Sequence, residues 1–259
     1  ERRIAAEDES TATLATEAAR RALNVAGLRP VDVDLIIVAT SSPEHIFPAT
    51  ACLVQDSLGA TRAGAFDLSA ACSGFIYAMS MASQAIRTGA SNTALVIGAE
   101  TLSRLVNWQD RTTCILFGDG AGAFVLQGRE EPGGVLSYVM RSDGSGGDSL
   151  IIPAGGSLHP TSQKTIDAGL HFVSMNGREV YRFATRVMVQ ATQEAVQKAG
   201  LTMQDINLIV PHQANLRIIE SALKGLDLPQ ERCVINVDRY GNTSTASIPI
   251  AAVEAVEAG

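Results

Sequence analysis

The sequence contains few cysteines, and their arrangement is typical of neither a metal site nor a disulfide framework. Four occur among 259 residues: Cys52, Cys72, Cys114 and Cys233. They are widely spaced, form no CxxC pair, and have no histidine nearby in a zinc-binding pattern. We therefore expect no bound metal. A chain of this size without a disulfide framework is typical of a reducing compartment, so we expect a cytoplasmic protein.

Charged residues and long apolar runs are scarce as well. Only 18% of the residues are charged, the formal net charge is −7, and no stripe of Lys and Arg is present. Nucleic acid is therefore not an expected partner. No run of about 18 uncharged apolar residues occurs, and no signal peptide is visible, so we expect no membrane association. The serine-hydrolase motif GxSxG is also missing.

Helices and short apolar strands alternate along the chain. Helices are predicted at residues 11–26, 48–58, 73–87 and 176–199, and strands at residues 35–38, 64–68, 94–98, 115–126, 135–141 and 208–210. The sequence GDGAGA within 115–126 looks like a dinucleotide fingerprint, but it lacks the preceding strand and following helix of a phosphate loop. The alternation predicts an α/β fold with a largely parallel sheet.

An internal repeat indicates how the chain is organised. When the sequence is shifted by 173 residues, its first helix–strand unit falls on a second one. The identical positions are Ala22, Ala26, Gly27, Leu28, Asp32, Leu35 and Ile36, which meet Ala195, Ala199, Gly200, Leu201, Asp205, Leu208 and Ile209. We infer two copies of one α/β unit. We predict an N-terminal half at 1–150 and a C-terminal half at 151–259, with a site that draws residues from both.

Cys72 is the cysteine whose surroundings favour catalysis. It lies in DLSAACSGF, where a predicted strand runs into a helix that is apolar or small nearly all round. The partial positive charge of a helix N-terminus stabilises a thiolate, and the small neighbouring residues leave room for a substrate carbonyl. The alternative is an inert, packed cysteine, which is our interpretation of the other three.

His212 and Asn242 each follow a predicted strand and precede a helix. His212 lies in NLIVPHQANLRI, and Asn242 lies in INVDRYGNTSTASIPI, near the position that the repeat makes equivalent to Cys72. Ligands and catalytic groups gather at the carboxyl ends of parallel strands. The alternatives are a structural histidine and an asparagine that serves a turn or helix cap.

Four segments together resemble one family. SAACSGF around Cys72, GDGAGAFVL, VPHQANLRII around His212 and DRYGNTSTASIP around Asn242 look like the β-ketoacyl-acyl carrier protein synthases of the third, chain-initiating class. The resemblance covers essentially the whole chain in the expected order. It implies the thiolase-like fold, an α/β unit duplicated in five layers (αβαβα), which agrees with the repeat.

The resemblance also implies an activity and its partners. Such enzymes condense an acyl-CoA starter with malonyl-acyl carrier protein to give 3-ketoacyl-acyl carrier protein and carbon dioxide, and so initiate fatty acid synthesis. They are acyltransferases, typically homodimeric, that use no cofactor beyond the coenzyme A thioester and no metal. Residue by residue, Cys72 matches the nucleophile, and His212 and Asn242 match the decarboxylation pair.

Three further positions match substrate contacts of the family. Arg217 in HQANLR falls where the family contacts the carrier protein, and Arg111 in WQDR falls where it contacts coenzyme A. Phe47 in EHIFPAT matches a residue that reaches into the partner subunit's acyl pocket. The family has additional segments before and after the matched region, so we interpret the sequence as a fragment of a longer protein.

Two other functions remain open from the sequence. The first is a secondary-metabolite or polyketide-type condensing enzyme or acyltransferase on the same scaffold, although SAACSGF differs from the usual plant polyketide synthase sequence. The second is a non-catalytic partner subunit, which the intact Cys, His and Asn set argues against.

Overall fold

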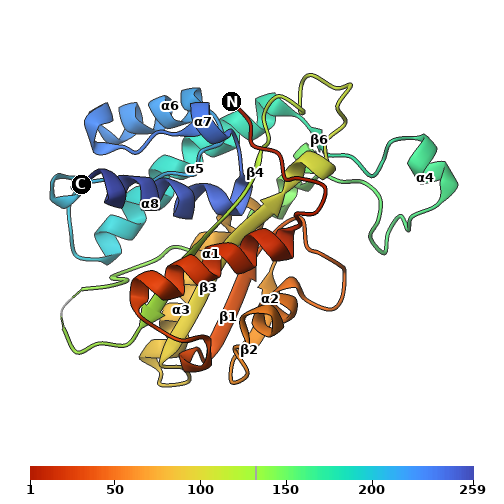
Figure 1. Ribbon diagram of the computed structural model, residues 1–259. Helices are drawn as coiled ribbons and strands as arrows, with labels where there is room; N and C mark the ends of the chain where they lie inside the picture. The colour runs from red at the N-terminus through yellow and green to blue at the C-terminus, as the bar shows by residue number, and fades with distance from the viewer. Residues whose placement is uncertain (132) are drawn as a thin grey trace.

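A four-stranded sheet forms the centre of the N-terminal half. The computed structural model describes residues 1–131 and 133–259. The strands are β1 (Leu35–Ala39), β2 (Gly64–Leu68), β3 (Thr93–Thr101) and β4 (Asp119–Gln127), in the order β2-β1-β3-β4. β1 is parallel to both β2 and β3, whereas β4 is antiparallel to β3 (Figure 1). The predicted parallel α/β arrangement is therefore present, with one antiparallel edge.

Helices cover both faces of this sheet. α1 (Thr11–Ala26) and α2 (Thr50–Leu58) pack on one face, and α3 (Gly74–Arg87) and α8 (Ser247–Ala258) pack on the other. Successive side chains of a strand point to opposite faces, and a strand covered on both faces is apolar throughout. In β1, Ile36 and Val38 accordingly join the cluster under α1 and α2, while Ile37 and Ala39 pack against α3.

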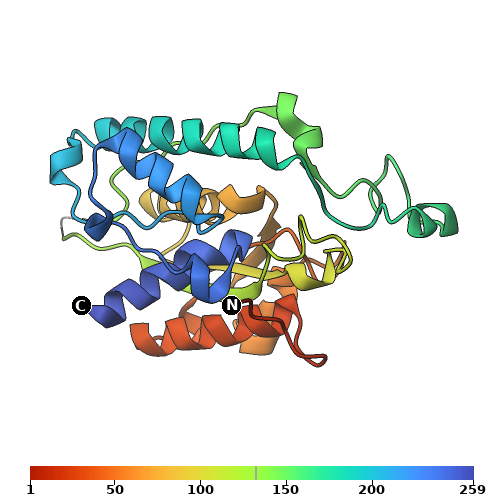
Figure 2. The ribbon, with the colours of Figure 1, turned by 90° about the horizontal axis from the view of Figure 1, so that it is seen from above.

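The remaining helices lie beyond α3 and α8. They are α4 (Gln163–Asp167), α5 (Gly177–Lys198), α6 (Leu216–Leu226) and α7 (Val237–Tyr240), and a two-stranded sheet pairs β5 (Leu150–Ile151) with β6 (Ser174–Met175). Seen from above, α1, the sheet, the pair α3 and α8, and the pair α5 and α6 follow one another across the molecule (Figure 2). The segment that carries α4 projects away from these layers (Figure 1).

The offset of 173 residues recurs in the three-dimensional structure. The 3-10 turn Pro30–Asp32 has a counterpart at Met203–Asp205, and the turn Ala71–Ser73 before α3 has a counterpart at Ser244–Ala246 before α8. Ala71 and Ser244 begin these last two turns with φ angles of 46° and 45°. Such a left-handed conformation costs a residue with a side chain about 1–2 kcal/mol. The two halves therefore build the same sharp turn into a helix.

Two of the strand predictions were wrong, and a third, at 115–126, began four residues too early. Residues 115–118 precede β4, and Phe117 forms a single parallel bridge with Asn242. Residues 135–141 form no strand, although Arg141 donates its backbone N–H to the Tyr77 hydroxyl at 3.0 Å. At 208–210 only Ile209 is paired, in one bridge to Cys233. Apolar patterning marks these segments as extended chain, but only a neighbouring strand in register converts such a segment into a ladder.

GDGAGA occupies β4, where its glycines permit close packing of α8. A Cβ atom at Gly122 would lie 2.8 Å from Cβ of Pro249. Gly98 of β3 likewise permits the turn before α8 to pack closely on the sheet, because a Cβ at Gly98 would lie 2.3 Å from the carbonyl oxygen of Thr245. The turn Ser244–Ala246 can lie this close to the sheet only because Gly98 has no side chain.

We expect Gly98→Ala to push the turn Ser244–Ala246 off the sheet. Overpacking of this kind typically costs about 1–3 kcal/mol, which thermal or denaturant unfolding would measure. The matched control is Gly156→Ala, because a Cβ at Gly156 meets nothing within 4 Å. Equal stability of the Gly98 variant and the wild type would contradict the close approach.

Candidate active site

Cys72 lies in the turn that joins β2 to α3. The turn Ala71–Ser73 is a 3-10 helix, and α3 begins at Gly74. Cys72 thus stands just before the α-helix, at its N-terminal end as predicted. The left-handed Ala71 redirects the chain at this point. The thiol is partly buried between the two halves of the molecule.

The pKa of the Cys72 thiol lies below its ordinary value. Burial raises it, but the positive charge and hydrogen bonding of His212, together with hydrogen bonding from Ser244, outweigh that effect. The sequence predicts stabilisation of the thiolate by the helix N-terminus, whereas the charge of His212 is the largest cause that lowers the pKa. The two residues act on each other: burial lowers the pKa of His212, but the charge and hydrogen bonding of Cys72, together with the charge of Glu100, raise it by more.

His212 is held from behind by Ser247. Its Nδ1 lies 2.6 Å from Oγ of Ser247, the first residue of α8. Its Nε2 is buried and forms no hydrogen bond within ordinary limits of length and angle among the described residues, although His212 lies close enough to Cys72 to lower the thiol pKa by charge and hydrogen bonding. With Nδ1 occupied, Nε2 is the ring atom left to interact with the thiol or with a substrate.

Asn242 is fixed by backbone on both sides. Its N–H donates to the carbonyl of Leu116 at 2.9 Å, and its carbonyl accepts from Gly118 N–H at 3.0 Å. Its side-chain Oδ1 accepts the Ser244 N–H at 2.9 Å. This bond assigns the oxygen of the amide, so the Nδ2 amide group is the donor that remains for a substrate.

Glu100, a residue that the sequence analysis missed, underlies the site. It ends the apolar run of β3 and is completely buried. Its carboxylate accepts hydrogen bonds from the Ser42 hydroxyl at 2.7 Å, the Thr245 hydroxyl at 3.0 Å and the Ser41 N–H at 3.1 Å. An acidic residue at the carboxyl end of an otherwise apolar strand was the signal that could have found it.

The charge of Glu100 acts on both reactive side chains. Burial raises the pKa of Glu100 itself, and its hydrogen-bond donors oppose that rise. Its negative charge raises the pKa of His212 and that of Cys72. Glu100 therefore favours the protonated imidazole and limits how far His212 can acidify the thiol.

The structure brings Cys72 and His212 together and leaves three sequence-predicted residues at the surface. Arg111 is exposed in the segment before β4, and Arg217 is exposed at the start of α6. Phe47 is 84% exposed in the segment before α2. These three positions suit contacts with molecules outside the chain, and their assigned roles remain predictions.

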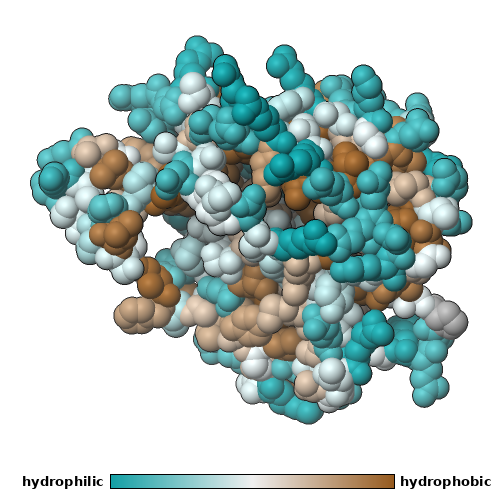
Figure 3. Space-filling view, turned by 180° about the vertical axis from the view of Figure 1, so that it is seen from behind, coloured by the Kyte–Doolittle hydropathy of each residue, from teal (hydrophilic) through white to brown (hydrophobic). Residues whose placement is uncertain are grey.

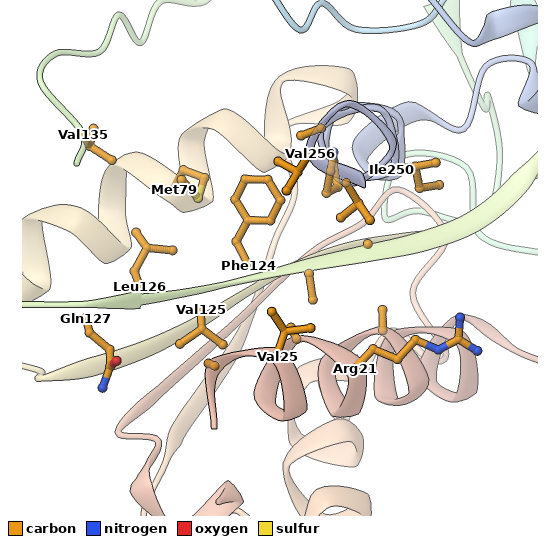
Figure 4. Close-up of a pocket in the computed structure, with 18 of the residues that line it drawn as sticks. Arg21, Val25, Met79, Phe124, Val125, Leu126, Gln127, Val135, Ile250 and Val256 are labelled. Atoms are coloured by element: carbon orange, nitrogen blue, oxygen red, sulfur yellow. The ribbon is translucent and has the colours of Figure 1, made fainter. Parts of the chain in front are cut away.

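An open groove lies away from Cys72. It has a volume of about 1640 Å³ and runs along the free edge of β4, between α1 and α8. Its lining includes Val25, Met79, Phe124, Leu126 and Val256 (Figure 4). Among the described residues that line it there is no cysteine or histidine, so the thiol chemistry lies elsewhere.

Neither a metal-binding cluster nor a membrane-spanning helix is found among the described residues. Outside position 132, no group of three or more His, Cys, Asp or Glu side chains is arranged to hold a metal ion. None of the helices in the same part of the chain has the length and apolar character needed to cross a bilayer.

We expect Cys72 to react with iodoacetamide as a thiolate at lower pH than an ordinary thiol, because His212 lowers its pKa. His212→Ala should raise that pKa and slow alkylation at neutral pH on the order of tenfold, since a charged hydrogen bond is lost. Rate–pH profiles from peptide mass spectrometry measure both effects. Cys233, whose pKa burial raises to about 11, is the internal reference. Faster labelling at Cys233 would contradict the assignment.

Comparison with known proteins places these features in one family. The family model described as 3-Oxoacyl-[acyl-carrier-protein (ACP)] synthase III matches residues 66–144, and the model of its C-terminal part matches residues 196–259. The first match contains Cys72, and the second contains His212 and Asn242.

Relatives and solved structures match over the whole chain. The sequence is 58% identical to the β-ketoacyl-[acyl-carrier-protein] synthase III of Symbiobacterium thermophilum and 54% identical to that of Caldanaerobacter subterraneus, covering 100% of this chain and 78% of each relative. The crystal structure of the synthase III from Aquifex aeolicus matches with a TM-score of 0.90 and 45% identity, covering 100% of this chain and 79% of that one. The synthase from Thermus thermophilus matches with a TM-score of 0.89 and 49% identity, with the same coverage. The predicted fold class and acyltransferase assignment are confirmed, and the chain belongs to the 3-oxoacyl-[acyl-carrier-protein] synthase III family.

Proposed function

We propose that this protein condenses an acyl-CoA starter with malonyl-acyl carrier protein, releasing carbon dioxide and giving 3-ketoacyl-acyl carrier protein at the start of fatty acid synthesis. The coupling of Cys72 with His212 is the observation that carries the proposal. It couples a thiol of one predicted half to an imidazole of the other, and Asn242 is the amide that we assign to the same site. This combination suits acyl transfer followed by stabilisation of an enolate.

The first half-reaction forms an acyl-enzyme at Cys72. The thiolate attacks the thioester carbonyl of acyl-CoA, the bond from that carbon to sulfur of coenzyme A breaks, and an acyl-cysteine remains. The departing coenzyme A thiolate takes its proton from Nε2 of His212. The lowered pKa of Cys72 supports this step, because it increases the fraction of the thiol that is present as the nucleophilic thiolate.

The second half-reaction generates and uses a carbanion. Malonyl-acyl carrier protein loses carbon dioxide, and negative charge develops on its thioester oxygen. Donors placed in advance at such an oxygen stabilise the transition state, and we assign this part to Nε2 of His212 and Nδ2 of Asn242. The carbanion attacks the acyl-cysteine and expels the Cys72 thiolate. Decarboxylation itself supplies the carbanion, so the scheme uses the thioester substrates without a further cofactor.

We propose surface roles for three exposed residues and a homodimer in the cytoplasm. Phe47 and its neighbour Ile46 are 84% and 86% exposed, which suits side chains that a partner subunit covers. The face of the molecule seen from behind carries separate hydrophobic clusters among hydrophilic side chains (Figure 3). Arg111 would contact coenzyme A, and Arg217 the carrier protein.

A polyketide-pathway role on the same scaffold is the second candidate. The priming β-ketosynthase of the R1128 polyketide pathway is 36% identical and matches with a TM-score of 0.87, covering 100% of this chain and 76% of that one. Product analysis with malonyl-acyl carrier protein against malonyl-CoA, over a series of acyl-CoA chain lengths, separates the two functions. A non-catalytic subunit would form no acyl-cysteine with any starter.

We expect Asn242→Ala to separate the half-reactions. It should still form the acyl-enzyme at Cys72, which mass spectrometry detects, but should release carbon dioxide from malonyl thioester about 100- to 1,000-fold more slowly. Cys72→Ala should form no acyl-enzyme yet retain some decarboxylation. His212→Ala should be impaired in both, because it loses a thiolate partner and an oxyanion donor. If Asn242→Ala decarboxylates malonyl thioester at the normal rate, the assignment of Asn242 as an oxyanion donor is wrong.

We expect Arg217→Glu to weaken the use of malonyl-acyl carrier protein, because carrier proteins are acidic and the reversed charge repels them. Acylation of Cys72 by acyl-CoA should change far less. The matched control is Lys224→Glu, which reverses a charge in the last turn of the same helix. Steady-state kinetics for each substrate measure the difference, and an equal loss in both half-reactions would refute this division.

A further inference from the structure

Ser247 occupies a position from which one hydroxyl serves three polar groups. It is 2% exposed at the start of α8. Its Oγ lies 2.6 Å from Nδ1 of His212, 2.9 Å from the carbonyl oxygen of Ser244 and 3.4 Å from the backbone nitrogen of Gln213. A hydroxyl has one proton and two acceptor lone pairs, so it can donate to His212 or to Ser244, but not to both.

Each choice matches one state of the imidazole ring. When Nδ1 of His212 carries a proton, it donates to Ser247, whose own proton then goes to the Ser244 carbonyl. When Nδ1 is bare, the Ser247 hydroxyl can turn and donate to it. The Ser244 carbonyl loses nothing essential by this rotation, because it also accepts the backbone N–H of Ser247. No heavy atom needs to move.

We propose that Ser247 is a positioning residue whose rotating hydroxyl lets His212 alternate between an imidazolium and a neutral ring with its proton on Nε2. The imidazolium is the partner of the Cys72 thiolate, and the neutral form is the donor to the malonyl thioester oxygen. This inference rests on the proposed function. A fixed backbone N–H or carbonyl in place of Ser247 would satisfy only one of the two ring states.

Protons balance over the cycle. In the first half-reaction Nε2 of His212 gives its proton to the coenzyme A thiolate, which leaves the remaining proton on Nδ1. Exchange with solvent then places one proton on Nε2 and removes the one on Nδ1, and Ser247 turns to donate. When the thiolate of Cys72 is expelled, Nδ1 takes one proton from solvent and Ser247 turns back. One proton is consumed per turnover, as required when a carboxylate leaves as carbon dioxide and coenzyme A leaves as a thiol.

The charged groups that act on His212 favour the same two states. Cys72 and Glu100 are the ionisable residues whose charges raise its pKa. While Cys72 is a thiolate, both negative charges support the imidazolium. Once Cys72 carries an acyl group, Glu100 alone remains, and the neutral ring becomes easier to reach. Acylation therefore biases the position of the Ser247 hydroxyl without any change in the fold.

The first test is the nitrogen-15 NMR spectrum of histidine-labelled protein, which distinguishes protonated from bare ring nitrogens. The chain has four histidines, so His212→Gln assigns the signals. In the Cys72→Ala variant, which lacks the thiolate, we expect the neutral ring of His212 to carry its proton on Nε2 and to leave Nδ1 bare. A neutral ring with its proton on Nδ1 would contradict the proposed alternation of His212 between its two protonation states.

The second test removes the hydroxyl. In Ser247→Ala the imidazolium loses its Nδ1 partner, so we expect alkylation of Cys72 at neutral pH to fall about tenfold and its rate–pH profile to move to higher pH. Ser247→Thr retains a hydroxyl and should restore the wild-type profile. Ser80→Ala is the control, because this buried serine of α3 donates only within its own helix.

The outcomes separate this inference from the proposed function. An unchanged alkylation profile in a folded Ser247→Ala variant, or a Ser247→Thr variant that behaves like it, would refute the role of Ser247. Neither measurement uses a substrate. If both give the expected result while acyl-CoA forms no acyl-enzyme at Cys72, the proposed function fails and the ring switch stands.

Discussion

The site depends on the contact between the turn Ser244–Ala246 and the carboxyl ends of β1 and β3. Thr245 makes this contact: its hydroxyl lies 2.8 Å from the Ala39 carbonyl and 3.0 Å from the Glu100 carboxylate, and its backbone rests over Gly98. All these groups are buried, where each unsatisfied polar atom would cost about 1–3 kcal/mol. These contacts hold the two halves in one relative position. They therefore also fix the positions of the residues beside Thr245.

Duplication explains why the two turns meet. Ala71 and Ser244 occupy equivalent places in the repeat and have the same left-handed conformation. The first turn presents a thiol, whereas the second presents hydroxyl groups and, just before it, an amide. Thr245, not Asn242, stands at the position equivalent to Cys72. One backbone design thus carries a nucleophile in one half and its supporting polar groups in the other.

Opposing charges set the state of the site. His212 lowers the pKa of Cys72 and Cys72 raises that of His212, so together they favour the ion pair. Glu100 raises the pKa of both, which supports the imidazolium but opposes the thiolate. Removal of the Cys72 charge takes away one of the two negative charges that raise the pKa of His212, and the acylation of Cys72 that we propose is such a change.

The sequence alone determined the α/β class, the 173-residue repeat, the parallel arrangement of β1, β2 and β3, and the candidate residues Cys72, His212 and Asn242. Local signals suffice for these, because apolar periodicity, glycine stops and motif context are all contained in short segments. Tertiary structure decided the rest. Whether residues 135–141 and 208–210 form strands depends on a neighbouring strand in register, and a local sequence pattern contains no information about such a neighbour. Glu100 and Ser247 gain their importance only from the partners that folding brings to their oxygens, across 145 residues in one case and 35 in the other.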